Sequence, residues 1–197
     1  MLQKKELEPR LREAEQGRRE VFFVDASHFV YGAFLAYLWC AVRLFVPTGS
    51  GRQRLNVLGA IGYASGKFVT EINTGSISSN EVCNLLRNIR RRCRQAVTVV
   101  LDNARYQRTA AVREAAERLN IELLYLPPYS PNLNLIERVW KLVKKLALSA
   151  RVLPDFECFC QSIVTTVNSL ETTRKKQVAS LLTPNFQTFD DVQLRAA

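Results

Sequence analysis

Two short apolar runs, each followed directly by an aspartate, constrain the fold of this chain more than any other feature. Residues 21–24 precede Asp25, and residues 97–101 precede Asp102. Continuous runs of β-branched, aromatic and aliphatic residues are typical of strands that are buried on both faces of a sheet. Functional groups of open α/β sheets gather beyond the carboxyl ends of such strands. We therefore predict two central strands that each end at a carboxylate.

The remaining patterns predict further strands and helices around these two. Strands are expected at residues 38–46, 55–63, 67–72 and 121–126. Helices, indicated by caps and by apolar residues that recur every three or four positions, are expected at residues 79–92, 109–119, 134–148 and 155–170. Ser79 or Asn80 is the expected cap of the first of these helices. An antiparallel meander followed by alternating strands and helices indicates an α/β fold with a mixed sheet flanked by helices.

Composition indicates the domain organisation and the class of partner. The 197 residues include 28 Lys+Arg against 18 Asp+Glu, a net charge of +10. This balance favours a polyanionic partner, nucleic acid or an anionic membrane surface, over a merely basic protein. Residues 1–20, where charge signs alternate, are expected to be a solvated helix or linker, followed by one domain at 21–190 and a tail at 191–197.

Several classes of protein do not fit the sequence. The longest uncharged apolar stretch, residues 29–42, is shorter than the roughly 20 residues of a spanning helix. The charged first 20 residues contain no apolar signal-peptide region. Five cysteines without a CxxC pair support neither a disulfide framework nor a zinc site. We expect a cytoplasmic, nucleoid-associated protein without a membrane partner.

The role of a third carboxylate, Glu137, is ambiguous from its spacing. It stands three residues after Asn134, as in a helix capping box, and four residues before Lys141, as in a surface ion pair. Asp102 is similarly open to a second interpretation, because Asp102 and Asn103 together favour a turn. Periodicity alone therefore leaves structural and chemical roles open for both carboxylates.

Three sequence blocks resemble those of a known family. Residues 101–107, Leu-Asp-Asn-Ala-Arg-Tyr-Gln, and residues 127–141, Pro-Pro-Tyr-Ser-Pro-Asn-Leu-Asn-Leu-Ile-Glu-Arg-Val-Trp-Lys, resemble the second and third blocks of the DDE transposases. Within that family they are most similar to the mariner-related branch of bacterial insertion sequences. Residues 22–29, Phe-Phe-Val-Asp-Ala-Ser-His-Phe, fit the segment that supplies the first aspartate. The resemblance covers about residues 20–190.

The resemblance implies an RNase H-like fold in which Asp25, Asp102 and Glu137 form an acidic triad that binds two Mg²⁺ ions, for which Mn²⁺ can substitute. The chemistry of the residues agrees, because carboxylate oxygens suit hard cations. Two such cations would neutralise a phosphodiester, activate a water or a 3′-hydroxyl and stabilise the leaving oxygen.

The implied function is that of a transposase catalytic domain, which cleaves DNA strands and joins a 3′ end to a target. An RNase H-like nuclease without strand transfer and an inactive DNA-binding remnant are the alternatives. The expected partners are transposon-end and target DNA, with a homodimer on the DNA. Complete family members carry a helix-turn-helix region before the first aspartate. Because Asp25 lies so early in the sequence, we expect a separate helix-turn-helix chain or a fused upstream product to direct cleavage.

Basic residues supply candidate phosphate contacts. One group lies at the end of the predicted helix 79–92, where cations also suit a helix C-terminus, and others follow Asp102 and Glu137. The candidates are Arg87, Arg90, Arg91, Arg92, Arg94, Arg105, Lys141, Lys144 and Lys145. Two further residues near the triad, His28 and Trp140, are expected to be structural, one as a hydrogen-bonded histidine and the other in the core.

Overall fold

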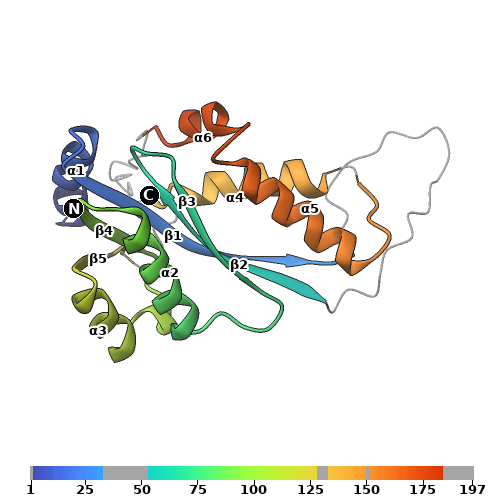
Figure 1. Ribbon diagram of the computed structural model, residues 1–197, viewed down its shortest axis with the longest axis horizontal. Helices are drawn as coiled ribbons and strands as arrows, with labels where there is room; N and C mark the ends of the chain where they lie inside the picture. Colours follow the sequence, from blue (N-terminus) through green and yellow to red (C-terminus); the bar gives the residue numbers. More distant parts are fainter. Residues whose placement is uncertain (1, 33–52, 128–132, 150, 184–197) are drawn as a thin grey trace, which may run out of the picture.

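A five-stranded mixed sheet forms the centre of the computed structural model, which describes residues 2–32, 53–127, 133–149 and 151–183 (Figure 1). The strand order is β3-β2-β1-β4-β5. The strands are β1 (Arg19–Val30), β2 (Arg54–Gly62), β3 (Phe68–Asn73), β4 (Ala96–Leu101) and β5 (Ile121–Tyr125). β1, β2 and β3 pair antiparallel, whereas β1, β4 and β5 pair parallel. The predicted meander followed by parallel strands is confirmed.

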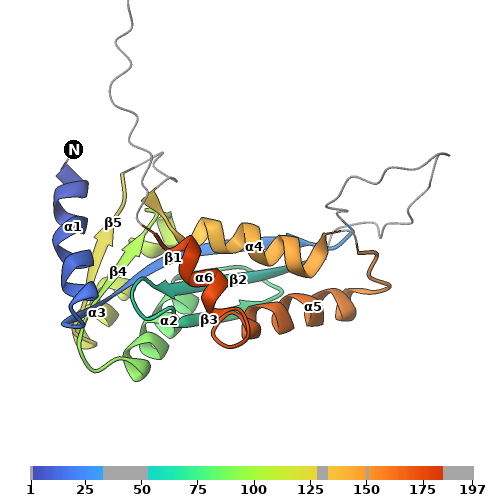
Figure 2. The same cartoon turned by 90° about the horizontal axis from the view of Figure 1, so that it is seen from above.

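Helices cover both faces of this sheet. They are α1 (Leu2–Glu15), α2 (Ser79–Arg92), the short 3₁₀ helix η1 (Arg105–Gln107), α3 (Ala110–Arg118), α4 (Ile136–Leu148), α5 (Phe156–Ser169) and α6 (Lys175–Leu181). In Figure 1, α2 and α3 lie below the sheet, and α4, α5 and α6 lie above it; Figure 2 shows the same layers from above. None of the helices in the described ranges is long and apolar enough to cross a bilayer.

Each face of β1 contributes to a different hydrophobic core. Val21, Phe23 and Phe29 pack with α1, α4 and α5, whereas Phe22 and Val24 pack with α2 and α3. Because side chains alternate between the faces of a strand, burial on both faces produces the continuous apolar run seen in the sequence. We call the side that contacts α4 the α4 face of the sheet.

β1 is longer than predicted, and the expectation that it ends at Asp25 is wrong. The strand continues to Val30, which pairs with Arg54 of β2. Its pairing with β4 stops at Phe23, so the second half of β1 is held by β2 alone. The continuous apolar run that indicated the first half of β1 stops at Asp25. In the second half a polar residue, Ser27, is buried and an apolar residue, Val30, is exposed, so hydrophobicity did not indicate a strand there.

Other elements differ from prediction in detail. The N-cap of α2 is Ser78, one or two residues before the expected cap, and its backbone N–H donates to Glu81 Oε2 at 2.7 Å to complete a capping box. Helix α6 was not expected. The predicted strand at residues 38–46 lies outside the described residues. Residues 2–15 form a helix, α1, whose Leu7 and Leu11 are buried in the core.

A charge network on β5 holds α1 against the sheet. The Glu122 carboxylate accepts hydrogen bonds from Arg10 Nε at 2.9 Å, from Arg19 Nη1 at 2.9 Å and from Thr98 Oγ1 at 2.7 Å. Arg19 also donates to Glu13 of α1 at 2.6 Å. The hydrogen bond from Arg10 is the main reason that the pKa of Glu122 is lowered to about 2. Ionised Glu122 therefore connects α1, β1, β4 and β5.

This network predicts a pH-dependent effect of Glu122→Gln. We expect the variant to lose on the order of 1 kcal/mol of unfolding free energy at pH 7, because half-exposed ion pairs are screened by solvent. The folded pKa of about 2 lies below the ordinary 4.5, so wild type loses this stabilisation progressively as the pH falls from about 4.5 toward 2. Urea unfolding at pH 7, 5 and 3 measures the difference, with Glu117→Gln on the exposed surface of α3 as the control. A deficit that stays constant with pH would contradict this role of Glu122.

Candidate active site

Asp25 of β1 and Asp102, which directly follows β4, lie at the same level of two neighbouring central strands. In the parallel pairing of β1 with β4, Phe23 stands opposite Val100. Asp25 stands two residues after Phe23, and Asp102 stands two residues after Val100. Phe23 and Val100 both belong to the core on the α4 face, and alternate residues of a strand share a face. The pairing register therefore directs both carboxylates toward the same side.

Glu137 reaches this side from the first turn of α4. The position of α4 is set by Asn134, whose buried Nδ2 donates to the backbone carbonyl of Val24 at 3.0 Å. The N-cap of the helix is Leu135, which makes no side-chain cap. The capping box considered for Asn134 and Glu137 is therefore not formed. The Asn134 side chain instead attaches the start of α4 to β1, one residue from Asp25.

The pKa values of Asp25 and Glu137 are both raised, in part by a neighbouring carboxylate. Burial raises the pKa of Asp25 to about 7, and the negative charges of Asp102 and then Glu137 add to the shift. Burial also raises the pKa of Glu137, with Lys141 opposing the shift and Asp102 adding to it. The pKa of Tyr106 is raised to about 12 by burial, Asp102 and Asp25. Asp25, Asp102 and Glu137 thus form one electrostatically coupled set.

The donor chemistry of this set fits divalent cations. Hard cations take carboxylate oxygens as ligands, and a bound cation offsets the burial and the mutual repulsion that raise the pKa values of Asp25 and Glu137. Among the residues that the structure describes, no three Asp, Glu, His or Cys side chains already form a metal-binding cluster. The set is therefore coupled by charge without being arranged as a finished coordination sphere.

Buried polar atoms without partners are concentrated around the carboxylates. In the described part of the chain, four such side-chain atoms have no hydrogen-bond partner: Asn103 Oδ1, Gln107 Nε2, Asn134 Oδ1 and Trp140 Nε1. Each residue lies within five positions of Asp102 or Glu137. Because most buried polar groups are hydrogen-bonded, this concentration distinguishes the site from the other residues that the structure describes.

The loop after β4 holds Asp102 through a residue that sequence reasoning missed. Fully buried Gln107 accepts hydrogen bonds through Oε1 from the backbone N–H groups of Asn103 and Ala104, both at 3.1 Å. The backbone of Asn103 is left-handed, with φ of 81°, a conformation that asparagine tolerates better than most residues. The Asp-Asn pair was a signal for this turn, but no local pattern identified Gln107 as its support.

The structure divides the basic candidates into two groups. Lys141, Lys144 and Lys145 lie on α4, the helix that carries Glu137, and exposed Arg105 follows Asp102 by three residues. Of the other candidates, Arg87 lies within the second half of α2, whereas Arg90, Arg91, Arg92 and Arg94 lie at or just after its end, which leads into the first residue of β4. The six-residue strand β4 separates them from Asp102, a length of about 20 Å.

Two of the arginines at the end of α2 have structural partners. Arg90 donates to the carbonyl oxygens of Cys93, which follows α2, and of Gln95. Arg92 donates to Glu171 at 2.9 Å and to the carbonyl of Phe68 at 3.1 Å. These bonds support the alternative that the cations stabilise the helix terminus. Arg91 and Arg94 are exposed at the same end of the sheet, and Arg87 is exposed within α2.

His28 lies on the other face of β1. It is an odd number of residues from Asp25 in an uninterrupted strand, so its ring points away from the α4 face. Its Nδ1 is 2.6 Å from Asn56 Oδ1, and Asn56 Nδ2 donates to the carbonyl of Gly75 at 2.8 Å. The structural role predicted for His28 is confirmed.

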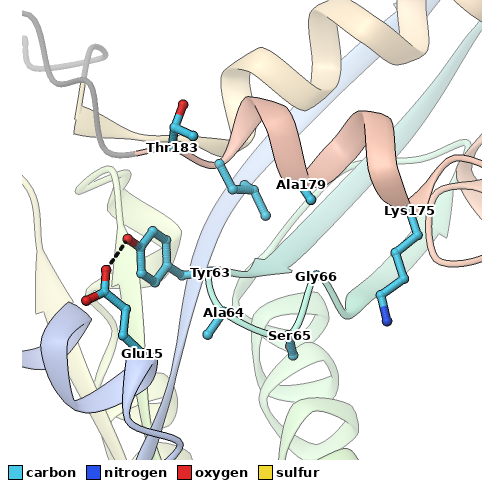
Figure 3. A pocket seen from close by; sticks show the side chains of 9 residues that line it. Glu15, Tyr63, Ala64, Ser65, Gly66, Lys175, Ala179 and Thr183 are labelled. Atoms are coloured by element: carbon cyan, nitrogen blue, oxygen red, sulfur yellow. Dashed lines mark hydrogen bonds between the residues drawn. The ribbon is translucent and has the colours of Figure 1, made fainter.

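A cavity of about 440 Å³ lies elsewhere in the molecule, between the end of α1, the β2–β3 turn and α6 (Figure 3). Tyr63 lines it and donates a hydrogen bond to Glu15 Oε1 at 2.8 Å. The β2–β3 turn lies at the end of the sheet where β1 begins, and none of the three carboxylates lines the cavity. It is therefore separate from the candidate active site.

Comparisons with known proteins agree with this geometry. The family described as DDE superfamily endonuclease matches residues 20–160. Among solved structures, the Mos1 strand transfer complex is 17% identical with a TM-score of 0.57, over 95% of this chain and 60% of that one. The HTLV-2 integrase catalytic core domain in complex with magnesium is 13% identical with a TM-score of 0.51, over 77% of this chain and 86% of that one.

A third structure, the simian T-cell lymphotropic virus intasome in complex with PP2A regulatory subunit B56 gamma, is 20% identical with a TM-score of 0.50. It is matched over 74% of this chain and 47% of that one. The chain thus spans about half to three fifths of the length of the intasome and Mos1 chains. No curated protein matches the chain. At these identities the likeness establishes the fold, which is that of transposase and integrase catalytic cores.

The raised pKa of Asp25 predicts an effect of Asp25→Asn that needs neither metal nor DNA. Because the folded pKa is about 7 against an ordinary 3.8, the folded protein retains a proton that the unfolded chain releases. Wild type therefore loses stability as the pH rises from about 4 to 7, whereas the neutral amide does not. We expect the stability of Asp25→Asn relative to wild type to grow by up to about 4 kcal/mol between pH 4 and pH 8.

Urea unfolding in the presence of a chelator measures this change, and Glu117→Gln is the control for removal of an exposed carboxylate. A stability difference between Asp25→Asn and wild type that does not change with pH would contradict the coupling of Asp25 to its neighbours.

Proposed function

Because this chain belongs to the DDE superfamily of endonucleases, we propose that it is a transposase catalytic domain that cleaves DNA strands and joins a 3′ end to a target. The observation that carries the proposal is the coupling of three carboxylates from β1, the end of β4 and α4 on one face of the sheet. All three lie within residues 20–160, which the family matches. The fold, the family and the charge distribution support the same assignment.

In this proposal Asp25, Asp102 and Glu137 hold two Mg²⁺ ions, and Mn²⁺ can take their place. When bound, the ions supply charge neutralisation of the phosphate, activation of a water or 3′-hydroxyl and stabilisation of the leaving oxygen. The pairing of β1 with β2 holds Asp25 in the sheet. The hydrogen bonds accepted by Gln107 hold the loop that begins at Asp102. The hydrogen bond from Asn134 to β1 holds the start of α4, the helix that carries Glu137, against the sheet.

Basic residues near the carboxylates would bind the DNA backbone. Lys141 and Lys145 are exposed on α4, and Lys144 lies with its Nζ 5.8 Å from the centre of the Phe29 ring. With Arg105 on the loop after Asp102, they place positive charge beside the proposed cleavage site. Such contacts position DNA without reading its sequence.

The proposed substrates are transposon-end and target DNA. One Mos1 match is a paired-end complex with a left transposon end, and another is a strand transfer complex. By analogy, two copies of this chain would act together on DNA, directed to the ends by a helix-turn-helix region in a separate chain or a fused product. Such a protein would work in the cytoplasm, at the nucleoid. A nuclease of the same fold would cleave but not join strands, so a strand-transfer assay with pre-cleaved ends in Mg²⁺ separates the two functions.

The catalytic assignment predicts the effect of Asp102→Asn. A neutral amide is a poor ligand for a hard cation, so Mg²⁺-dependent cleavage should fall below detection while folding and DNA affinity stay close to wild type. Gel-based cleavage of labelled duplex, circular dichroism and DNA binding in chelator measure the three properties. Glu117→Gln should cleave normally. Full cleavage by a folded Asp102→Asn protein would refute the role of the triad.

The two groups of basic residues predict different effects on DNA binding. We expect Lys141→Gln/Lys145→Gln to weaken DNA binding and cleavage, and to reduce the slope of log affinity against log salt by about 2, since each lost phosphate contact removes about 1. Arg91→Gln/Arg94→Gln removes the same charge about 20 Å away at the other end of β4. A larger cleavage loss from the arginine pair would place the DNA path at the end of α2 instead.

A further inference from the structure

The indole N–H of Trp140 is a buried donor that core packing does not explain. Trp140 is only 4% exposed and lies one helical turn after Glu137 on α4. Its Nε1 has no hydrogen-bond partner in normal geometry among the described residues. A phenylalanine would fill the same core without burying a polar atom, and buried polar atoms are normally satisfied. The N–H group therefore requires an explanation of its own.

The position of the indole ring is determined from three sides. Phe29 contacts it edge-on with ring centroids 6.2 Å apart, and Phe68 does so at 5.7 Å. On the third side is Gly59 of β2. A Cβ atom added there would lie 2.7 Å from the ring atoms Cη2 and Cζ2 of Trp140, so the indole occupies the space that a side chain at position 59 would need.

This contact places the N–H group beside Asp25. Gly59 is the antiparallel partner of Asp25 in the β1–β2 pairing, and the Cβ positions of such partners lie about 5 Å apart on the same face. Cζ2, the ring atom against Gly59, is bonded to the carbon that carries Nε1. The indole N–H is close enough to the Asp25 carboxylate to favour its ionised form slightly, although burial and the neighbouring carboxylates dominate and keep the pKa of Asp25 raised.

We propose that Trp140 is a positioning residue, whose indole N–H holds the Asp25 carboxylate in the orientation that binds a divalent cation, and that Gly59 is required to admit the indole. The inference rests on the proposed function, in which Asp25 is a metal ligand. Groups that orient a ligand commonly change metal affinity by 10- to 100-fold when they are removed. The Nε1 donor lies near the Asp25 carboxylate without a hydrogen bond of normal geometry, and cation binding would bring the carboxylate into alignment with it.

The first test removes the N–H group and keeps the aromatic ring. Trp140→Phe and Trp140→benzothienylalanine both lack the donor, and the second differs from tryptophan only by sulfur in place of N–H. We expect each to bind Mn²⁺ about tenfold more weakly than wild type, as measured by calorimetric titration with MnCl₂ in the absence of DNA. Mg²⁺-dependent cleavage should need a correspondingly higher Mg²⁺ concentration for its half-maximal rate. The melting temperature of the benzothienylalanine protein should stay close to wild type.

The second test moves the indole without altering it. Gly59→Ala introduces a methyl group at the contact with the ring, so it should weaken Mn²⁺ binding as Trp140→Phe does. Gly75→Ala is the matched control, because a Cβ atom at that position meets no atom within 4 Å, and it should bind Mn²⁺ like wild type.

The outcomes separate this inference from the proposed function. Unchanged Mn²⁺ affinity in the benzothienylalanine protein, together with loss of cleavage in Asp102→Asn, would overturn the role of Trp140 and leave the triad intact. Cleavage by folded Asp102→Asn would instead refute the proposed function. If Gly75→Ala weakens Mn²⁺ binding as much as Gly59→Ala, the effect is not due to the indole contact and the inference also fails.

Discussion

The pairing of β1 with different partners on its two edges is the constraint on which the rest of the structure depends. β4 pairs with its first half in parallel, and β2 pairs with most of its length in antiparallel. Asp25 lies where the parallel pairing has just ended and the antiparallel pairing continues. It is therefore held by a rigid strand while the space on the β4 side opens to the loop of Asp102. A strand that ended at Asp25 would have left this carboxylate on a loop.

The electrostatics of the site depend on this position. A carboxylate in the middle of a strand is partly buried, so its charge is poorly solvated, and two further carboxylates nearby increase the cost. Such repulsion is tolerated because the hydrogen bond that Asn134 donates to β1 and the hydrogen bonds that Gln107 accepts from the loop after β4 fix the neighbouring elements. The stabilising charges of the molecule lie elsewhere, in the Glu122 network that docks α1. Stability and the proposed chemistry are thus assigned to different ends of the sheet.

Much of the fold was predictable because the signals were local. The apolar runs of β1 and β4, the spacing of α2 and the turn residues between β2 and β3 each describe one segment. The prediction was wrong at the end of β1, because His28 and Val30 are exposed and pairing with β2 is a property of two segments. The capping-box alternative for Asn134 is not realised for the same reason, since this side chain instead bonds to a strand 110 residues away.

The sequence by itself determined the mixed α/β architecture and, through its resemblance to a family, the three acidic residues to consider. Hydrophobic periodicity acts along the chain, so it can be read without knowing what each segment contacts. Only the tertiary structure decided which face each residue occupies and which partners surround it. The alternation of side chains along β1 puts Asp25 and His28 on opposite faces. The length of β4 separates the arginines at the end of α2 from the carboxylates. The contact with Gly59 places Trp140 beside Asp25. These facts depend on register and helix docking, which join residues that no local pattern connects.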